Sequence, residues 1–274
     1  MGIAERVQAV VDAGKAPGLH GVVVVRGGET VVEHYGAGPD HVLNEALGHV
    51  VFDRDTPHDV RSVTKSVVAL LYGVALRDGL VPEPAARLVD QFPEHPDLAA
   101  DPRRARLTVE HALTMTLGLD WNEDVPYTSP DNSEIAMELA PDRNRFVLER
   151  PIVEEPGKRW RYCGGASALI GALVARGAGK PLEEYAAQAL FEPLGIDRFE
   201  WSKGSDGVVL AASGLRLRPV DLAAIGRAVL DGGLGIVPGD WLRELARPRV
   251  TIEGTFRYGY QWYVGTGDRQ WVQA

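Results

Sequence analysis

The sequence predicts a mixed α/β (α+β) protein in which an antiparallel sheet is flanked by helices and a mostly helical subdomain is inserted between the strands. Two observations lead to this prediction. Runs rich in β-branched and aromatic residues lie near both ends of the chain, at residues 20–25, 29–35 and 258–264. Between them, apolar residues recur at helical spacing in segments separated by prolines and glycines.

The chain length of 274 residues suits one large domain or two small ones. We expect a single domain over residues 1–274. Its sheet layer would come from residues 1–60 and 205–274, because the strand patterns lie there, and its helical subdomain from about residues 61–204.

The first 60 residues predict a helix, a hairpin and a loop region. Four apolar residues follow helical spacing within residues 1–14, namely Ile3, Val7, Val10 and Val11. The two β-rich runs that follow flank Gly27-Gly28, a pair typical of a hairpin turn. Residues 36–59 are rich in turn-forming residues and predict loops.

The longest apolar segment, residues 62–76 (SVTKSVVALLYGVAL), predicts a helix that is buried nearly all round, with its polar residues at the N-terminal end. Asp221 is expected to cap a helix over residues 222–230. The run Tyr258–Val264 is expected to form one strand. Further helices are predicted at residues 108–116, 132–138, 166–176 and 182–190.

Composition excludes several functional classes. The chain has 29 basic and 38 acidic residues, a net charge of −9 that repels a phosphate backbone, so no nucleic-acid partner is expected. A single cysteine, Cys163, excludes an internal disulfide framework. No apolar run reaches the ~20 residues of a membrane span, and charges interrupt residues 1–14 where a secretory leader would lie. We expect a cytoplasmic protein without a membrane partner; its oligomeric state is left open.

Most familiar catalytic motifs are absent. The chain has no HExxH and no Walker A loop, and Gly165–Leu169 (GASAL) lacks the last glycine of a GxSxG elbow. Gly265-Thr266-Gly267 lacks the third glycine of a dinucleotide-binding loop. The seven histidines are scattered without metal-ligand spacing, so no metal site is expected.

One motif, Ser62-Val63-Thr64-Lys65, has the form S-x-x-K. A capping serine followed by a surface lysine gives the same letters, but a lysine in the first turn opposes the helix dipole. Because the helix behind it is apolar, Lys65 is expected to be desolvated, which lowers the pKa of its amine and lets it take a proton. Lys65 can reach the Ser62 hydroxyl at i+3, and a helix N-terminus suits a developing oxyanion.

Tyr162 is the candidate for a third group that moves the proton between nucleophile and leaving group. It follows the Pro156-Gly157 turn and precedes an apolar helix, which would place its phenol where sheet and helix meet. A core tyrosine bonded to the backbone is the alternative.

At these residues the chain resembles the serine β-lactamase and penicillin-binding superfamily, in its class C and esterase-like branch, and most of all the 6-aminohexanoate-dimer (nylon-oligomer) hydrolases. The similarity extends over nearly the whole chain. Five ordered segments carry it: Ser62–Lys65 (SVTK), His111–Leu119 (HALTMTLGL), Trp121–Asp124 (WNED), Glu155–Tyr162 (EPGKRWRY) and Gly214–Gly233.

The resemblance implies a serine hydrolase of small esters or amides. Ser62 would form an acyl-enzyme, with Lys65 and Tyr162 as the general base/acid pair, and water would release the acid. The oxyanion hole would use the Ser62 N–H and a second N–H from an edge strand. No metal or organic cofactor is implied. Tyr127 and Trp121 are placed on the substrate side, although a tyrosine that only lines the rim would look the same.

Other hypotheses stay open. An acyltransferase would use the same three residues, with an alcohol or amine in place of water. A relative that binds a ligand without turnover belongs to a different class. Loops at about residues 36–58 and 120–145 are expected to shape the pocket.

Two departures from the family pattern stand out. Tyr162-Cys163-Gly164 replaces Y-x-N, so the amide that would orient Lys65 and the substrate is missing, which favours an esterase or amidase over a β-lactamase. Cys163 is interpreted as a small buried hydrophobe. The family's third motif is not found before Ala274, so we expect that the C-terminal strands of the fold are missing here and that the native chain continues.

Overall fold

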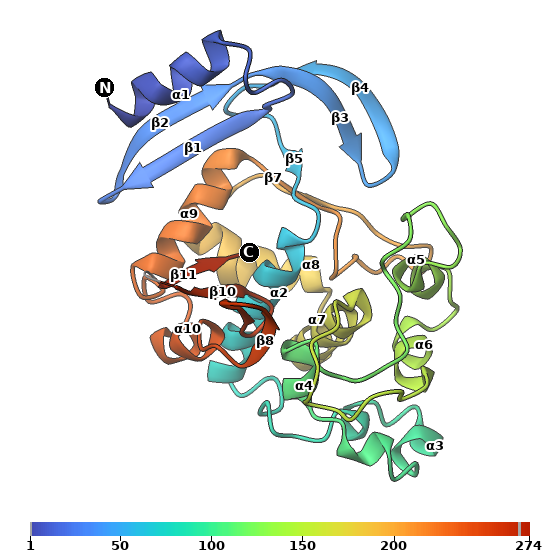
Figure 1. Ribbon diagram of the computed structural model, residues 1–274. Coiled ribbons are helices and arrows are strands. Elements are labelled where there is room, and N and C mark those ends of the chain that lie inside the picture. The colour runs from blue at the N-terminus through green and yellow to red at the C-terminus, as the bar shows by residue number, and fades with distance from the viewer. Residues whose placement is uncertain (1, 268–269) are drawn as a thin grey trace.

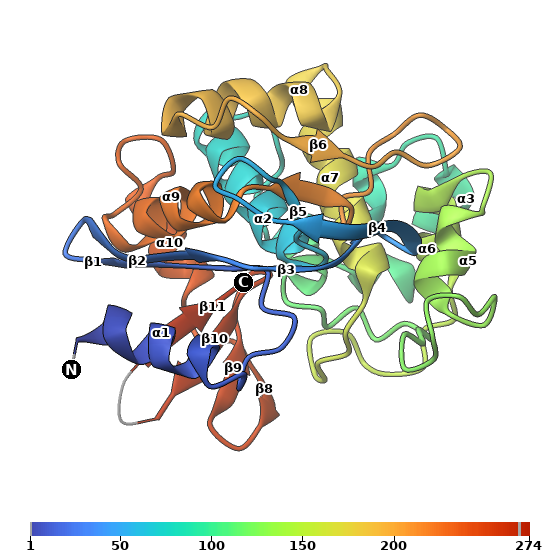
Figure 2. The ribbon, with the colours of Figure 1, turned by 90° about the horizontal axis from the view of Figure 1, so that it is seen from above.

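The computed structural model describes residues 2–267 and 270–274 and confirms the predicted combination of helices and antiparallel sheets (Figure 1). The buried helix α2 (Val63–Arg77) lies at the centre and packs against α7 (Gly164–Ala178). Seen from above, α8 (Leu182–Ala186) and the C-terminal strands lie on opposite sides of α2 (Figure 2). Twelve consecutive residues of α2, from Thr64 to Ala75, are buried, so this helix forms the middle of the core.

The N-terminal helix and hairpin lie where the sequence predicts them. Helix α1 (Ile3–Asp12) is followed by β1 (Gly21–Arg26) and β2 (Glu29–Tyr35), which pair antiparallel with Arg26 opposite Glu29. The two turn residues, Gly27 and Gly28, have φ values of 59° and 84°. Both are left-handed, as a two-residue hairpin turn of type I′ requires, and glycine adopts that conformation without strain.

The prediction of loops over residues 36–59 is wrong. Strands β3 (Ala37–Val42) and β4 (Glu45–Val51) form a second hairpin, and β5 (His58–Asp59) follows. The segment contains glycine, proline and asparagine, which are uncommon in strands, so its sequence does not show the usual strand pattern. The pairing accommodates them with a register shift between Asp40 and His41.

A small sheet fixes the chain just before the S-x-x-K motif. Its central strand β7 (Leu215–Leu217) pairs antiparallel with β5 and with β6 (Glu200–Trp201). The Val60 N–H also donates to the Leu215 carbonyl at 2.9 Å. Residue 62 is therefore placed by a strand that is distant in sequence.

The predicted helices of the middle and late segments are present, with bounds that differ by a few residues. Helix α8 ends early because Ala187–Phe191 continue as a π-helical turn. Besides α2, α7 and α8, the helices are η1 (Val89–Gln91), α3 (Pro96–Ala99), η2 (Arg104–Arg106), α4 (Val109–Leu113), α5 (Ser133–Glu138), α6 (Arg143–Glu149), η4 (Glu192–Leu194), α9 (Pro219–Leu230) and α10 (Gly239–Leu245).

The assignment of Asp221 as an N-cap is wrong. The N-cap of α9 is Arg218, and the Asp221 carboxylate accepts the Arg218 backbone N–H at 3.1 Å from the third helical position. The helix starts earlier because Pro219 occupies its first position, where a fixed φ and a missing N–H are both tolerated.

The C-terminal segment forms a four-stranded antiparallel sheet. In spatial order its strands are β11 (Gln270–Gln273), β10 (Tyr263–Thr266), β9 (Phe256–Tyr258) and β8 (Val250–Glu253). The single strand predicted over residues 258–264 is therefore wrong, because a turn divides it. In this turn the Gly259 N–H donates to the Trp262 carbonyl and Gln261 has a φ of 58°.

The described strands of the two chain ends do not share one sheet. β1 and β2 pair only with each other, and β8–β11 pair among themselves. Short turns join β1 to β2, β8 to β9 and β9 to β10, so these pairings stay local. Helix α9 packs against β1 instead of a further strand.

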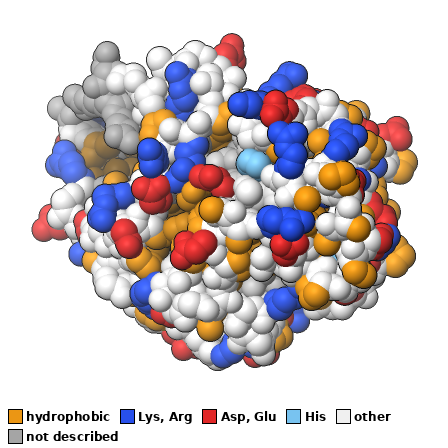
Figure 3. Space-filling view, turned by 90° about the horizontal axis from the view of Figure 1, so that it is seen from below, with side chains coloured by type: hydrophobic (Ala, Val, Ile, Leu, Met, Phe, Trp, Pro, Cys, Tyr) orange, Lys and Arg blue, Asp and Glu red, His pale blue; other side chains and the backbone are white. Residues whose placement is uncertain are grey.

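The surface of the molecule mixes charges. Figure 3 shows acidic and basic side chains interspersed over one face, with hydrophobic side chains between them. Within the described residues, no helix is both long and apolar enough to cross a lipid bilayer.

Gly73→Ala is expected to lower the free energy of unfolding by about 1–3 kcal/mol, although alanine favours a helix. A Cβ at Gly73 would lie 2.0 Å from the Trp241 ring, which packs over α2 and donates to the Ala69 carbonyl. The matched control is Gly226→Ala in α9, where a Cβ meets nothing within 4 Å and should stabilise. Urea unfolding measures the free energy of unfolding of both variants. Equal stabilisation by Gly73→Ala and Gly226→Ala would contradict the close packing of Trp241 on Gly73.

Candidate active site

The two ends of the S-x-x-K motif meet as the sequence predicts. Ser62 lies directly before α2, and its side chain makes no capping hydrogen bond. The Lys65 Nζ lies 3.1 Å from the Ser62 Oγ, and the lysine is only 2% exposed. The alternative of a capping serine with a surface lysine is therefore wrong.

The residue before Ser62 has a strained backbone. Arg61 has a φ of 48°, a left-handed conformation that non-glycine residues rarely adopt. Its N–H donates to the Asp59 carboxylate at 2.8 Å, and its guanidinium donates to the Leu43 carbonyl. These contacts hold the turn that presents Ser62 at the end of the buried helix.

The Lys65 ammonium is surrounded by groups from four parts of the chain. Besides Ser62, it donates to the Ala212 carbonyl at 2.7 Å. The Glu134 Oε2 lies 3.7 Å away, and the centre of the Tyr162 ring lies 4.8 Å away. The structure thus brings together Ser62, Lys65 and Tyr162, the three residues predicted to be catalytic.

The predicted lowering of the Lys65 pKa is wrong. Burial is the largest single influence and does act in that direction, but Glu134, Tyr162 and Glu123 together outweigh it, with Glu134 contributing most among them. The pKa of Lys65 is therefore raised above its usual range, and the ammonium form is favoured. No local sequence pattern places a carboxylate from residue 134 beside this lysine.

Glu134 is a functional candidate that sequence reasoning missed. The residue is 4% exposed, and its Oε1 lies 3.4 Å from the Ser213 hydroxyl. Burial raises the pKa of Glu134 to about 7; Lys65 opposes this shift and the nearby Glu123 adds to it. A carboxyl group that titrates near neutrality beside the motif is typical of a functional site.

Glu123 organises the residues predicted to lie on the substrate side. One carboxylate oxygen accepts the Trp121 indole N–H and the Gly164 backbone N–H, each at 2.5 Å. The other oxygen accepts the Tyr127 hydroxyl at 2.7 Å. Trp121 is 2% exposed and Tyr127 is 39% exposed, so the tryptophan holds Glu123 from within while the tyrosine lies at the rim.

Ser62 opens into a pocket of about 580 Å³, a size suited to a small molecule. Its walls come from the turn between β3 and β4 and from the segment that leads into α5 and α5 itself, which fall within residues 36–58 and 120–145, although the first of these regions is a hairpin and not a loop. The lining residues are Leu43, Asn44, Arg61, Ser62, Tyr127, Glu134, Ile135, Glu138, Leu210 and Ser213. Tyr162, Trp121 and Glu123 border a neighbouring cavity of about 450 Å³.

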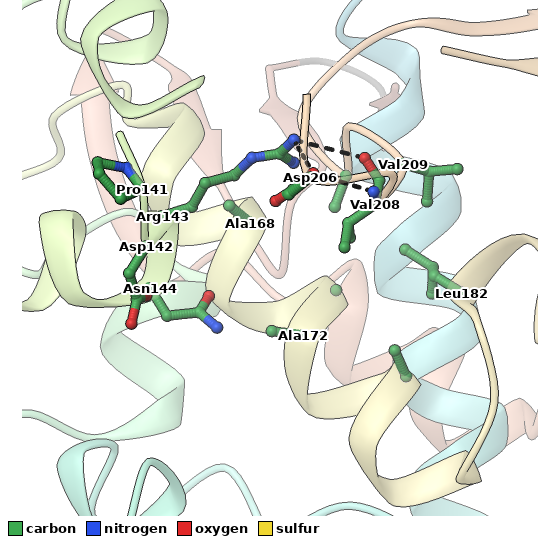
Figure 4. A pocket seen from close by; sticks show the side chains of 13 residues that line it. Pro141, Asp142, Arg143, Asn144, Ala168, Ala172, Leu182, Asp206, Val208 and Val209 are labelled. Atoms are coloured by element: carbon green, nitrogen blue, oxygen red, sulfur yellow. Dashed lines mark hydrogen bonds and ion pairs between the residues drawn. The ribbon is translucent and has the colours of Figure 1, made fainter. Parts of the chain in front are cut away.

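Another cavity, of about 250 Å³, lies between α6, α7 and residues 206–211 and contains neither Ser62 nor Lys65 (Figure 4). Arg143 extends across it toward Asp206, at 2.7 Å. The same guanidinium lies 3.2 Å from Glu138, so its charge is already balanced by two carboxylates. We interpret this cavity as a structural feature.

Cys163 is buried, and burial raises the pKa of its thiol well above the usual range. It therefore behaves as the small hydrophobe that the sequence suggests and not as a nucleophile. Within residues 2–267 and 270–274, no three His, Cys, Asp or Glu side chains are grouped to hold a metal ion.

Comparison with known proteins agrees with this geometry. A sequence model of the Beta-lactamase family matches residues 3–273. The chain belongs to the Beta-lactamase family. Among solved structures, EstCE1, a hydrolase with promiscuous acyltransferase activity, is similar with a TM-score of 0.77 and 17% identity over 96% of this chain and 82% of that one. At this identity the likeness shows the fold alone.

Two curated relatives are also similar to this member of the Beta-lactamase family. The 6-aminohexanoate-dimer hydrolase of Paenarthrobacter ureafaciens is 24% identical over 91% of this chain and 62% of its own length. The monacolin J acid methylbutanoyltransferase of Aspergillus terreus is 30% identical over 52% of this chain and 37% of its own length. The chain thus spans less than two thirds of the length of these relatives.

Proposed function

We propose that the protein is a serine hydrolase that acts on small esters or amides through an acyl-enzyme on Ser62. The observation that carries this proposal is the 3.1 Å contact between the Ser62 hydroxyl and the buried Lys65 ammonium, at the end of a helix that opens into a 580 Å³ pocket. A serine hydroxyl needs such a neighbour, because alone it is a weak nucleophile at neutral pH.

In the proposed reaction, the Ser62 Oγ forms a bond to the substrate carbonyl carbon, and its proton passes to the Lys65–Tyr162 pair. Because Lys65 is held as an ammonium, Tyr162 is the proton acceptor and Lys65 stabilises the phenolate. The Ser62 N–H at the helix end would receive the oxyanion. The proton then goes to the departing alcohol or amine, and water releases the acid by the same steps in reverse.

The pocket favours neutral substrates. Leu43, Ile135 and Leu210 supply apolar surface. The charged groups of the lining are of both signs, with Arg61 on one side and the carboxyls of Glu134 and Glu138 on α5, so no single charge is favoured. Tyr127 and Trp121 remain predicted contacts on the substrate side.

A second candidate function is acyl transfer, in which an alcohol or amine replaces water. It is supported by the relatives, since one curated relative is named as a methylbutanoyltransferase and EstCE1 as a hydrolase with acyltransferase activity. Partitioning of the acyl group between water and added methanol, followed by product analysis, separates the two reactions.

Treatment with a fluorophosphonate probe is expected to add one adduct, which peptide mapping should place on Ser62. A p-nitrophenyl ester should be hydrolysed and should compete with the probe. The control is Ser213→Ala, which removes another hydroxyl of the same pocket and should leave the labelling of Ser62 intact. Absence of labelling together with absence of turnover would favour a ligand-binding relative and overturn the proposal.

A further inference from the structure

Resting on the proposed function, we propose that Glu134 is a positioning residue for Lys65 and that it occupies the space freed by the absent side chain at Gly164. The position of Gly164 is the third of the Tyr162-Cys163-Gly164 segment, where the family resemblance leads one to expect an asparagine. The carboxylate would thus replace, from a different helix, a group that the local sequence lacks.

The backbone at Gly164 carries the geometric argument. A Cβ built on Gly164 would lie 2.0 Å from the Glu134 Oε2 and 2.8 Å from its Cδ. The same Cβ would lie 3.2 Å from the Glu123 Oε1. Contacts this short do not occur between real atoms, so a side chain at residue 164 and the Glu134 carboxylate exclude each other.

The start of α5 fixes the direction of Glu134. The fully buried side chain of Asn132 caps this helix by accepting the N–H groups of Glu134 and Ile135 at 2.9 and 3.3 Å. Its amide also donates to the Val125 carbonyl at 2.9 Å. The cap therefore ties the first turn of α5 to the preceding loop and directs the Glu134 side chain toward α2.

The Glu134 Oε2 is committed to Lys65. It is buried and accepts no hydrogen bond from a protein donor, and the Lys65 Nζ lies 3.7 Å away as its ion-pair partner, with the Glu123 carboxyl also beside the Glu134 carboxyl. The two side chains are 2% and 6% exposed. A buried pair of this length is a weak source of stability, since desolvation offsets its attraction. Its main effect is instead to keep the Lys65 side chain protonated and to hold it in position.

Several titratable groups face Glu134, and the tests must take them into account. They come from four segments: Lys65 of α2, Glu123 and Tyr127 of the loop before α5, Glu138 of α5 itself, and Cys163 before α7. Among them Lys65 is the one cation. Removal of the Glu134 charge therefore leaves Lys65 with less compensation for its burial.

The first test measures the lysines directly in the full chain. The protein has five lysines, so their side-chain signals can be followed by NMR after isotope labelling. In the wild type, Lys65 should stay protonated to a pH above the usual range of a lysine side chain. In Glu134→Gln the Lys65 ammonium should lose its proton at a clearly lower pH than in the wild type. An unchanged Lys65 titration in this variant would overturn the proposal.

The matched control for this titration is Glu138→Gln. Burial raises the pKa of Glu138 to about 7 as well, but its partner is Arg143. This variant removes a carboxyl of the same kind from the same helix and should leave the Lys65 titration as it is in the wild type. An equal shift in both variants would contradict a specific role for Glu134.

The second test uses activity. Glu134→Gln is expected to lower kcat/KM for a p-nitrophenyl ester by about 10–100-fold at pH 7, the range seen when a catalytic group is misplaced. The ionisation near pH 7 should also disappear from the pH profile of kcat/KM. A variant with the wild-type profile would overturn the positioning role. Loss of the proposed function itself would instead appear as a wild type that is neither labelled nor active.

The third test exchanges the two positions. Gly164→Asn alone should lose activity because its side chain meets the Glu134 carboxylate. The double variant Glu134→Ala/Gly164→Asn should be at least tenfold more active than Gly164→Asn, because the space taken by the Glu134 carboxylate is then free for the asparagine side chain. Circular dichroism establishes that each variant folds. A folded double variant that is no better than Gly164→Asn would show that the two residues do not share this space.

Discussion

Ser62→Ala and Lys65→Met are each expected to reduce kcat/KM for a p-nitrophenyl ester by about 10³-fold or more. The two groups lie 3.1 Å apart. In the proposed mechanism they act as one unit, Ser62 as nucleophile and Lys65 as the cation that supports proton transfer. The double variant should therefore be hardly worse than either single variant, because the second change removes a group that no longer has a partner. Initial rates of p-nitrophenol release measure all three.

Lys65→Arg serves as the control for charge. An arginine keeps the positive charge but has a planar guanidinium that does not fit the place of an ammonium and does not give up its proton. The kcat/KM of Lys65→Arg should therefore be close to that of Lys65→Met. Multiplicative losses in the Ser62→Ala/Lys65→Met variant would contradict a shared step, and so would a Lys65→Met variant with near wild-type rates.

Asp40→Ala is expected to lower the free energy of unfolding by about 3 kcal/mol, because the buried Arg216 loses its buried partner and keeps only the ion pair with Glu200, whose side chain is 64% exposed. The Arg216 guanidinium donates to the Asp40 carboxylate at 2.8 Å, and the two side chains are 6% and 7% exposed. Arg216 also donates to the carbonyls of His41 and Pro57, each at 2.8 Å. This pair ties β3 to β7, the strand that pairs with β5 just before Ser62.

The effect of Asp40→Ala should depend on pH. Burial is the largest single influence and raises the pKa of Asp40, but the hydrogen bonds from Arg216 and the His41 N–H together with the Arg216 charge outweigh it and lower the pKa below its usual value. A lowered folded pKa means that the stabilisation is present above the unfolded value of about 4 and is lost as the pH falls through the folded value. Urea unfolding should therefore show a smaller difference in the free energy of unfolding between Asp40→Ala and the wild type below pH 4 than at pH 7.

Two further variants complete this test. The double variant Asp40→Ala/Arg216→Met should lose less free energy of unfolding than the sum of the two single losses, because no buried charge is then left without its buried partner. Asp197→Ala, whose carboxylate lies 2.9 Å from Arg218 but is 81% exposed, should change stability little. A small effect at Asp40 similar to that at Asp197 would show that the buried pair does not hold β3 to β7.

The candidate site shows how far the sequence reached. Ser62 and Lys65 are three residues apart on one helix, so their contact follows from helix geometry alone. Tyr162 was reached through its motif, and the structure places its ring 4.8 Å from the lysine ammonium. Glu134 was missed because no local pattern links it to Lys65. The glycine at position 164 was the only sequence feature related to Glu134. It indicates that the carboxyl needs space there, and this is clear only once α5 is known to pack beside residue 164.

The same limit appears in the fold. The run 258–264 was interpreted as one strand because its aromatic pattern is continuous, yet the chain turns at Gly259, where a Cβ would lie 2.0 Å from the Leu245 carbonyl. The hairpin of β3 and β4 was missed because its pairing tolerates glycine and proline through a register shift. In both cases a contact with a distant segment overrode the local pattern.

The sequence by itself determined the buried helix and the contact between Ser62 and Lys65, because both depend on residues within a few turns of one another. It also determined the family, through motifs that keep their order along the chain. Only the tertiary structure decided the charge of Lys65. Burial by itself would lower the pKa of that amine, and the sequence predicts burial correctly. The Glu134 carboxylate from α5, together with Tyr162 and Glu123, reverses the sign of the pKa shift, since electrostatic energy depends on distance in space and not along the chain.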